Sequence, residues 1–359
     1  MRTVHAVVPA GLTDRGRPSG GNAYDLRVLT GLGELGWTVC LFEVDGTWPT
    51  PDRAARCRLS GVLACIPDGS PVLLDGLVAS AVPEVIAPER DRLRLVTLVH
   101  LPLGHEWGAG APDGQDAARR EREREVLAAA TTLITTSRWT RAWLLDAYGL
   151  DPDRVHAAPP GSEEAAEARP EPSGSRLLCV GAVTPTKGHD VLLDALSRIV
   201  DLPWSLTCVG ALDIDPGFVA DLAVRIGRAG LDTRITLAGP CGGDRLQTMY
   251  AVADLVLVPS RIESYGMVAT EALARGIPVI GSDVGGLPEA LDGPTPGDRP
   301  GLLVPPGDDA CLAAALREWI TDPDLRDRLR AAARRRRATL DGWSATTQRV
   351  SEILDEVAA

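Results

Sequence analysis

Short apolar runs alternate with segments of helical periodicity along almost the whole chain of 359 residues. The strand-like runs of the first half cover residues 4–9, 38–43, 73–75, 95–100 and 133–136. Those of the second half cover residues 177–180, 205–209, 235–238, 255–258 and 278–281. Helical patterns separate them, at 23–35, 119–129, 139–148 and 190–199 among others. This rhythm predicts parallel strands joined by right-handed helical crossovers, and hence an α/β protein with doubly wound sheets.

The rhythm is interrupted most clearly by RPEPSGS at residues 169–175, where two prolines and a glycine exclude a helix. We therefore expect a Rossmann-like domain over 1–168, a linker over 169–175 and a second Rossmann-like domain over 176–338. Helical patterns end the chain, and the last one, within 339–359, is a candidate to pack back on the first domain. Open sheets of this kind bind ligands at the carboxyl ends of their strands, so we expect a cleft between the domains.

The charge of the chain narrows its choice of partners. A net charge of −12 argues against nucleic acid as the main partner, because phosphate backbones repel an acidic surface. The arginine run 334–337 is interpreted as the solvated face of a late helix, with contact to an anionic membrane as the alternative.

The apolar and cysteine patterns suggest a protein of the cytoplasm. The longest apolar stretch, 71–87, is interrupted by Asp75, Pro83 and Glu84, so no membrane span is expected. Met1 leads directly into a strand-like run, which predicts no secretory signal. The seven cysteines are odd in number and lack CxxC spacing, which favours reduced thiols. We expect a cytoplasmic protein, with peripheral attachment to the inner membrane face as a further option.

Lys187 is the single lysine in a chain that has 37 lysines and arginines together. It stands at a strand-to-helix turn, in LLCVGAVTPTKGHDVLLDAL. A compact ammonium on a flexible stem is well suited to a phosphate oxygen, whereas an isolated surface lysine is the alternative.

The most specific stretch of the chain is 253–291, where a buried strand leads through Glu263 to a helix opened by Gly266. The backbone N–H groups of Gly266, Met267 and Val268 would be unpaired donors at a helix start, which suits a diphosphate. Glu271 lies one turn further in and could bind a vicinal diol such as ribose. Glu263 could accept from sugar hydroxyls. A solvent-exposed helix residue and a helix-start acid are the respective alternatives.

These motifs resemble a known family. ESYGMVATE resembles the E-x7-E signature of glycosyltransferase family 4, whose members are retaining enzymes with the GT-B fold. VGAVTPTKG, GSDVGGLPE, LLVPPGD and VHAAPPGSE resemble other segments of that family. The resemblance is strong over 177–308 and weaker over 1–160. It implies two Rossmann-like domains facing across a cleft, and transfer of a hexose from a nucleoside-diphosphate sugar to a hydroxyl acceptor. UDP is the favoured nucleotide and GDP the second.

The resemblance also implies roles for single residues. Lys187 would bind the donor diphosphate, Glu271 the ribose, and Glu263 the hydroxyls of the transferred sugar. The amides of Gly266, Met267 and Val268 would contact the donor, and no metal would be required. One departure matters, because Ala182 stands where the family usually has arginine. Arg261 and Arg138 are candidates to replace that cation.

The first half contributes two weaker signals. Gly20 and Gly21 join the first strand to the first helix and would let backbone N–H groups face the donor; a plain turn is the alternative. His100 follows a buried strand and resembles the family histidine that points at the transferred sugar, with a core histidine as the alternative. No carboxylate or cysteine is suitably grouped with His100 and His105, so we expect no metal there. The catalytic set is therefore predicted as His100, Lys187 and Glu263.

Some motifs and alternative functions have still to be considered. The DxD at Asp213 and Asp215 lacks the context of a metal motif and is interpreted as a loop feature. GxGxxG and P-loop motifs are absent, which disfavours an NAD enzyme or a P-loop NTPase. A nucleotide-sugar epimerase or phosphorylase, and a non-catalytic nucleotide-sugar-binding subunit, stay as alternatives. The arginine- and alanine-rich composition is typical of a high-GC bacterium. The hexose, the acceptor and the oligomeric state are left open.

Overall fold

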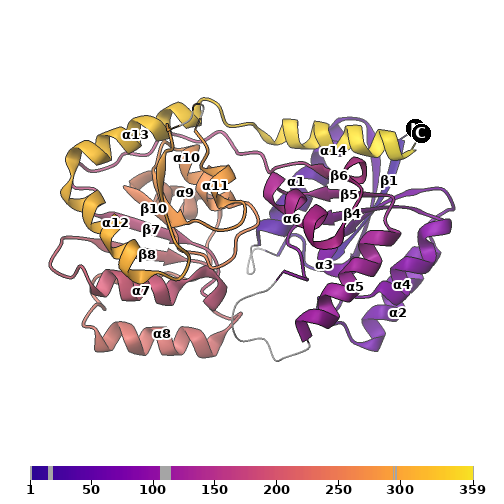
Figure 1. Ribbon diagram of the computed structural model, residues 1–359, viewed down its shortest axis with the longest axis horizontal. Coiled ribbons are helices and arrows are strands. Elements are labelled where there is room, and N and C mark those ends of the chain that lie inside the picture. The colour runs from indigo at the N-terminus through magenta and orange to yellow at the C-terminus, as the bar shows by residue number, and fades with distance from the viewer. Residues whose placement is uncertain (1, 15–18, 106–114, 294, 296, 359) are drawn as a thin grey trace. The chain divides into compact units, whose positions relative to one another are not determined.

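A computed structural model describes residues 2–14, 19–105, 115–293, 295 and 297–358 of the chain (Figure 1). The chain divides into two compact units. Of the described residues, unit 1 contains those within 2–14, 19–161 and 343–358, and unit 2 contains those within 162–342. Each unit is a parallel sheet with helices on both faces, as the alternation of strand and helix patterns predicted.

The sheet of unit 1 has six parallel strands in the order β2-β1-β3-β4-β5-β6. They are β1 (Arg2–Pro9), β2 (Trp37–Val44), β3 (Pro71–Asp75), β4 (Arg94–Val99), β5 (Thr132–Thr135) and β6 (Val155–Ala157). The helices are α1 (Gly20–Glu34), α2 (Arg53–Ala64), α3 (Gly76–Ala79), α4 (Pro83–Ile86), α5 (Gln115–Ala129), α6 (Arg138–Tyr148) and α14 (Trp343–Ala358). The five strands expected here are confirmed, whereas β6, a three-residue strand at the sheet edge, was missed.

Alternating side chains of β1 belong to two hydrophobic cores. Val4 and Ala6 pack with residues of α1 and α14, while Val7 packs with Leu59 and Leu63 of α2. The last helix of the chain, drawn in yellow, thus lies against α1 in unit 1 (Figure 1). Ser162 and Gly342, the first and last residues of the long segment of unit 2, form an isolated parallel bridge.

The sheet of unit 2 also has six parallel strands, in the order β12-β11-β10-β7-β8-β9. They are β7 (Arg176–Val180), β8 (Ser205–Val209), β9 (Ile235–Leu237), β10 (Leu255–Val258), β11 (Val279–Ser282) and β12 (Gly301–Val304). The helices are α7 (His189–Ser197), α8 (Pro216–Arg228), α9 (Gly243–Val252), α10 (Met267–Leu273), α11 (Leu287–Ala290), α12 (Asp309–Thr321) and α13 (Pro323–Arg337). The five expected strands are again confirmed, and the edge strand β12 was missed.

Strand order places one topological switch point in each unit. The chain changes direction across the sheet between β1 and β3 in unit 1, and between β7 and β10 in unit 2. Loops that leave the carboxyl ends of strands diverge at such a point and open a crevice for a ligand. The residues that follow β1, β3, β7 and β10 are therefore the first places to look for a site.

Residues 169–175 do not form the boundary between the units, which lies at Gly161 and Ser162. Asp254 accepts hydrogen bonds from the backbone N–H groups of Glu171 and Arg176, and the Gly174 carbonyl accepts one from the Trp319 indole. The prolines and the glycine of this segment do exclude a helix, but its backbone is tied into unit 2. The linker expected from composition is thus an extended part of that unit.

The arginine run at the end of α13 is mostly exposed, as expected for the solvated face of a late helix, and it also contacts other segments of the same unit. Arg334 pairs with Glu167, Arg335 pairs with Asp298, and Arg337 donates to the carbonyls of Ala165 and Ala274. Two of these arginines hold the segment that enters unit 2 against α13.

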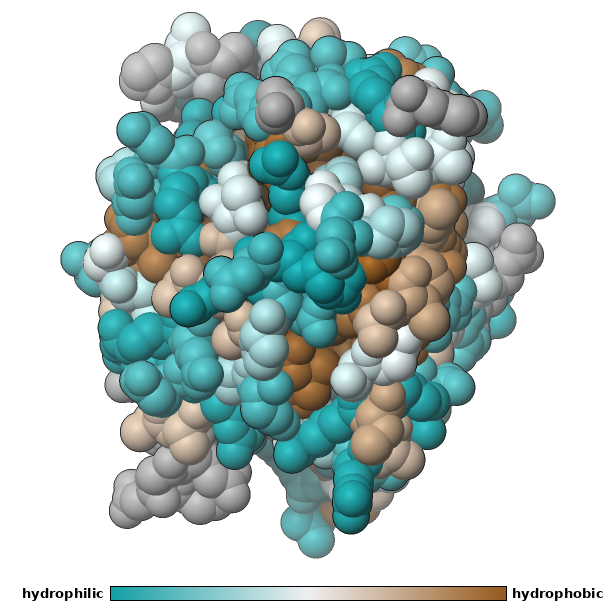
Figure 2. Space-filling view, turned by 90° about the vertical axis from the view of Figure 1, so that its right-hand side faces the viewer, coloured by the Kyte–Doolittle hydropathy of each residue, from teal (hydrophilic) through white to brown (hydrophobic). Residues whose placement is uncertain are grey.

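Helices in the described ranges lack the combination of length and apolarity that a membrane crossing requires. On the side of the molecule seen in Figure 2, hydrophilic side chains cover most of the surface and apolar ones occupy narrower areas among them. All seven cysteines are free thiols, in agreement with the expectation from their spacing.

Candidate functional site

Two loops meet at the switch point of unit 2, one after β7 and the other after β10. Gly188 ends the turn after β7 with a φ of +70°, and a Cβ at this position would lie 2.0 Å from the Pro259 carbonyl oxygen. Glycine is thus required twice, for its left-handed conformation and for its close approach to the neighbouring loop. This approach brings the turn that carries Lys187 beside the loop that carries Glu263.

Lys187 and Glu263 form an ion pair across these loops, with 2.7 Å between Nζ and Oε2. The Ser260 hydroxyl donates to the same carboxylate oxygen at 3.3 Å. The Lys187 side chain is 35% exposed and that of Glu263 is 14% exposed, so the ammonium remains open to solvent while the carboxylate is largely covered. Both side chains line a small cavity together with Val268.

Arg261 joins the two loops from the side. Its backbone N–H donates to the Thr186 carbonyl, and its guanidinium donates to the Pro185 carbonyl and to both carboxylate oxygens of Asp190. Burial would raise the pKa of Asp190, but the hydrogen bonds and charge of Arg261 lower it. Arg261 is thus a cation that contacts the Lys187 turn directly, and its charge is balanced by Asp190.

Glu271 lies on α10, where its carboxylate accepts a 2.7 Å hydrogen bond from the Tyr250 hydroxyl of α9. Arg275 stacks its guanidinium over the Tyr250 ring, 4.5 Å from the ring centre, and donates to the Glu271 carbonyl. Burial raises the pKa of Glu271, although Tyr250 and Arg275 oppose the increase. One carboxylate oxygen of Glu271 is therefore held by the protein, and the other can accept from a ligand.

Helix α10 begins as the sequence predicted. Gly266 is its N-cap, with a φ of +101°, and its carbonyl accepts from the N–H groups of Ala269 and Thr270. The N–H groups of Met267 and Val268 precede the first of these helical hydrogen bonds and are the orphan donors of a helix start. The backbone of Glu263 is held as well, because its carbonyl accepts from the N–H of Gly286.

At the switch point of unit 1, the segment of Gly20 and Gly21 lies close to His100. Gly20 and Gly21 open α1, and a Cβ on Gly21 would lie 3.4 Å from Cδ2 of His100. The backbone of α1 thus passes directly over the imidazole, which follows the last residue of β4. Gly21 and His100, which are 79 positions apart in the chain, are thus neighbours in the fold.

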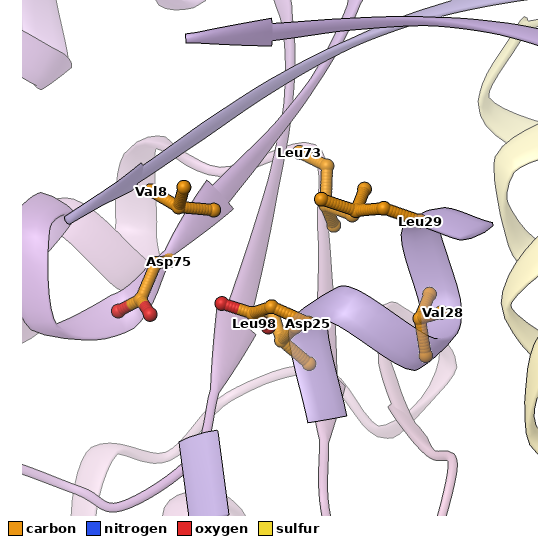
Figure 3. Close-up of a pocket in the computed structure, with 7 residues that line it drawn as sticks. All are labelled: Val8, Asp25, Val28, Leu29, Leu73, Asp75 and Leu98. Carbon is orange, nitrogen blue, oxygen red and sulfur yellow. The ribbon is translucent and has the colours of Figure 1, made fainter. Parts of the chain in front are cut away.

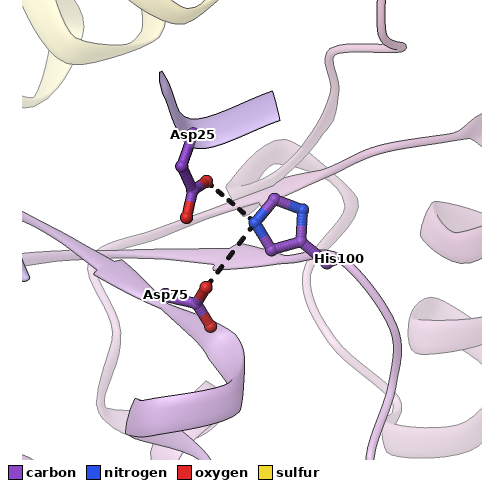
Figure 4. A group of neighbouring side chains, drawn as sticks. All are labelled: Asp25, Asp75 and His100. Atoms are coloured by element: carbon purple, nitrogen blue, oxygen red, sulfur yellow. Dashed lines mark hydrogen bonds and ion pairs between the residues drawn. The ribbon is translucent and has the colours of Figure 1, made fainter. Parts of the chain in front are cut away.

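Two carboxylates lie on the other side of the ring. The His100 Nε2 atom is 2.8 Å from Oδ1 of Asp25 and 3.7 Å from Oδ2 of Asp75 (Figure 4). Asp25 comes from the buried face of α1, and Asp75 is the last residue of β3. We call Asp25, Asp75 and His100 the buried acid cluster. The expectation that no carboxylate is grouped with His100 was wrong, because both acids are distant from it in the chain.

Burial and the charges of neighbouring side chains shift the pKa values of His100 and Asp75. Burial alone would lower the pKa of His100, but the charge and hydrogen bond of Asp25 and the charge of Asp75 raise it to about 9. Burial raises the pKa of Asp75 to about 7, although the charge of His100 opposes the increase. The charges of the two acids thus favour the protonated form of His100, while burial works against the ionised form of Asp75.

Among the described residues, the buried acid cluster is also the group that could hold a metal ion, since its ligand atoms all lie within 4.8 Å of one another. The 2.8 Å between Nε2 and Oδ1 has the length of a hydrogen bond. Two ligands of a tetrahedral zinc, each about 2.0–2.1 Å from the metal, would stay roughly 3.3 Å apart. The observed spacing is that of a hydrogen bond, and the absence of a metal here stays a prediction.

The acids could have been suspected from their positions. Asp25 is a carboxylate on the helix face that otherwise carries Tyr24, Val28, Leu29 and Leu32, and Asp75 ends a buried strand. Tyr250, Ser260 and Asp190 gave no such signal, because each stands in an ordinary helix or loop pattern.

The remaining candidates lie elsewhere. Asp215 caps α8 through a hydrogen bond from the Phe218 N–H, which agrees with the interpretation of the DxD as a loop feature. Arg138 is the first residue of α6 in unit 1, and Ala182 lies between β7 and Lys187 in unit 2.

Sequence comparison relates the chain to known proteins. Residues 162–336 match the family described as Glycosyl transferases group 1. A D-inositol 3-phosphate glycosyltransferase of Thermomonospora curvata is 34% identical over 299 residues, which is 75% of this chain and 67% of that protein. The protein of the same name from Jonesia denitrificans is 34% identical over 272 residues, 70% of this chain and 63% of that protein. The chain spans about 60% of the length of several such relatives.

Structural comparison confirms the expected GT-B fold. Sucrose-phosphate synthase from Thermosynechococcus elongatus superimposes with a TM-score of 0.81 at 22% identity, over 99% of both chains. Anabaena HepE in complex with UDP-glucose superimposes with a TM-score of 0.76 at 18% identity, over 99% of this chain and 100% of that chain.

Proposed function

Because the chain belongs to the glycosyl transferase group 1 family, we propose that it transfers a hexose from a nucleoside-diphosphate sugar to a hydroxyl group of an acceptor. The configuration of the anomeric carbon is retained. The supporting observation is the meeting of Lys187 and Glu263 at the β7/β10 switch point, with Glu271 one helical turn further along the same segment. A UDP-sugar is the favoured donor and a GDP-sugar the second.

The proposed mechanism relies on charges that are already in place. As the bond to the leaving diphosphate breaks, negative charge grows on its oxygens. The Lys187 ammonium and the N–H groups of Gly266, Met267 and Val268 stabilise this charge, without a metal ion. Preorganised donors of this kind act strongly because they need no reorientation during the reaction. The departing phosphate accepts the proton of the incoming hydroxyl.

The other residues hold the two ends of the donor. The free carboxylate oxygen of Glu271 accepts from the ribose hydroxyls, while Tyr250 fixes its partner oxygen. Glu263 accepts from hydroxyls of the transferred sugar. His100 and the loop of Gly20 and Gly21 contact the sugar and the donor phosphates, as the resemblance implies.

The test is the release of nucleoside diphosphate from a panel of UDP-, GDP-, ADP- and TDP-sugars, with and without acceptors. D-Inositol 3-phosphate is the first acceptor to try, because relatives carry it in their names. We expect acceptor-dependent release from one class of donor, unchanged turnover in EDTA, and a product whose anomeric configuration by NMR equals that of the donor.

Other outcomes would contradict the proposal. Conversion of the donor sugar without an acceptor would indicate an epimerase, and a requirement for inorganic phosphate or a sugar phosphate would indicate a phosphorylase. Tight binding of a nucleotide sugar with no product from the whole acceptor panel would indicate a binding subunit.

A further inference from the structure

The imidazole of His100 has one nitrogen committed to the protein interior. The hydrogen bond to Asp25 and the ion pair with Asp75 both use Nε2, and Nδ1 lies on the opposite side of the ring (Figure 4). The side chain of His100 is 19% exposed, whereas those of Asp25 and Asp75 are 3% and 5% exposed. The ring is thus more exposed than the two acids, and Nδ1 is the ring nitrogen that neither acid engages.

The two acids differ in what they offer the ring. Asp25 is within hydrogen-bond distance of Nε2 and thereby selects the form in which Nε2 carries a proton. Asp75, at 3.7 Å, is too far for a good hydrogen bond but near enough to act through its charge. One of its oxygens accepts from the Leu77 N–H, which holds the carboxylate in place at the start of α3.

A small cavity beside the two acids reinforces this arrangement. Oδ2 of Asp25 is buried and lacks a hydrogen-bond partner among the described residues. Asp25 and Asp75 line a cavity whose other walls are the apolar side chains of Val8, Val28, Leu29, Leu73 and Leu98 (Figure 3). Its free volume of about 10 Å³ holds on the order of one water molecule. Two carboxylates in such surroundings are costly unless positive charge compensates them.

The groups that face His100 come from three elements. Helix α1 supplies Asp25 and Tyr24, whose ring meets the imidazole edge-on at 5.3 Å between centres. Burial raises the pKa of the Tyr24 phenol, which stays neutral. Strand β3 supplies Asp75. The Thr136 hydroxyl, after β5, donates to the His100 carbonyl and fixes the backbone. The ring thus faces two acids and one phenol.

We infer that Asp25 and Asp75 are positioning residues that hold His100 as an imidazolium, so that its Nδ1–H donates a hydrogen bond to an oxygen of the substrate. The histidine is then a fixed cationic donor and not a general base. The Nε2–H group donates a hydrogen bond to Asp25, and the Nδ1–H group donates one to the ligand. Both protons stay on the ring. This inference rests on the proposed function for the identity of the ligand, but the state of the ring does not depend on it.

The acids can be tested separately because asparagine preserves different features at the two positions. Asp25→Asn keeps an oxygen that accepts from Nε2–H and removes the charge. Asp25→Leu removes both. Asp75→Asn removes only a charge, since Asp75 makes no short contact with the ring. Trp37→Phe is the control, because it deletes a buried hydrogen bond to Ser351 elsewhere in unit 1.

The first measurement is ¹⁵N NMR of the five histidines across the pH range, with His100 assigned by His100→Gln. We expect His100 of the wild type to remain doubly protonated at pH 8. Asp25→Asn and Asp75→Asn should each lower its pKa by about one to three pH units, the effect of one charge at this distance. Asp25→Leu should also change the preferred tautomer, whereas Trp37→Phe should change neither property.

The second measurement is the pH profile of turnover, with the donor and acceptor that show acceptor-dependent release in the panel described under the proposed function. Each asparagine variant should lower kcat at pH 8 with little change in KM for the donor nucleotide, and activity should recover as the pH is lowered. A purely structural role would lower activity at every pH.

Two results would overturn the inference. One is a His100 that titrates near 6.5 in the wild type, or identically in wild type, Asp25→Asn and Asp75→Asn. The other is loss of the Nε2–H signal on addition of zinc or magnesium at stoichiometric concentration, which would make the cluster a metal site. Because NMR needs no turnover, a protein that lacks transferase activity could still confirm the state of the ring.

Discussion

The ammonium of Lys187 lies 2.7 Å from the carboxylate of Glu263, across the two loops at the β7/β10 switch point. The proposed function gives these groups different partners, the donor diphosphate for Lys187 and sugar hydroxyls for Glu263. When a donor that carries both a diphosphate and a sugar separates the ion pair, Lys187 gains the diphosphate as a partner and Glu263 gains the sugar hydroxyls. A nucleoside diphosphate without the sugar compensates only Lys187.

Glu263→Gln should therefore bind free nucleoside diphosphate more tightly than the wild type, since Lys187 loses its competing anion. Transfer should fall in the same variant by about 10²–10³, the typical effect of losing one preorganised polar contact to the transition state. Isothermal titration calorimetry with UDP and steady-state turnover measure the two effects.

Glu352→Gln is the matched control, because Glu352 is a half-exposed acid on α14. Weaker binding of UDP to Glu263→Gln, with Glu352→Gln unchanged, would show that the ion pair does not compete with the diphosphate.

Lys187→Ala should lower turnover by roughly 10²–10³ through lost stabilisation of the leaving group. Lys187→Arg should restore little, because a planar guanidinium cannot replace a compact ammonium in a turn that packs against the next loop. Single-turnover rates at saturating donor are the appropriate measurement. Wild-type rates in Lys187→Ala would contradict the assignment of the diphosphate to this residue.

Glu271→Gln and Tyr250→Phe should both weaken nucleotide binding, the first more than the second. Glutamine supplies one acceptor in place of a charged carboxylate, while Tyr250→Phe leaves the carboxylate intact but removes the hydrogen bond that orients it. The loss should shrink for a 2′-deoxynucleoside diphosphate, which lacks one of the hydroxyls that Glu271 is proposed to bind. Equal losses for the ribo- and deoxyribonucleotide would place Glu271 away from the ribose.

The stability of the protein should fall as the pH rises from about 6.5 to about 9. The folded state holds His100 protonated up to a pKa of about 9, above its ordinary value of 6.5. The contribution is thus complete below pH 6.5 and is lost as the pH rises through 9. Asp75, with its pKa raised from 3.8 to about 7, adds a fall of the same sign at lower pH. Thermal melting from pH 6 to 9.5 tests this, and His100→Gln should flatten the upper part of the curve.

Local patterns were sufficient for most of the fold and for half of the proposed donor site. Period and strand length predicted ten of the strands, because runs such as 255–258 are buried on both faces and need only their own side chains to be recognised. Gly266, Glu263 and Glu271 could be found together because they lie within one strand-loop-helix segment. The strands missed, β6 and β12, are edge strands of three and four residues.

The sequence by itself determined the alternation of strands and helices and the start of α10, since each depends on neighbours in the chain. It also showed that Lys187 is the single lysine. Only the tertiary structure decided that Lys187 faces Glu263, that Tyr250 orients Glu271, and that Asp25 and Asp75 enclose His100. In a parallel sheet, residues that leave neighbouring strands can be dozens of positions apart in the chain. Their distances, and hence their charges and pKa values, are set by strand order and by packing, which no local pattern specifies.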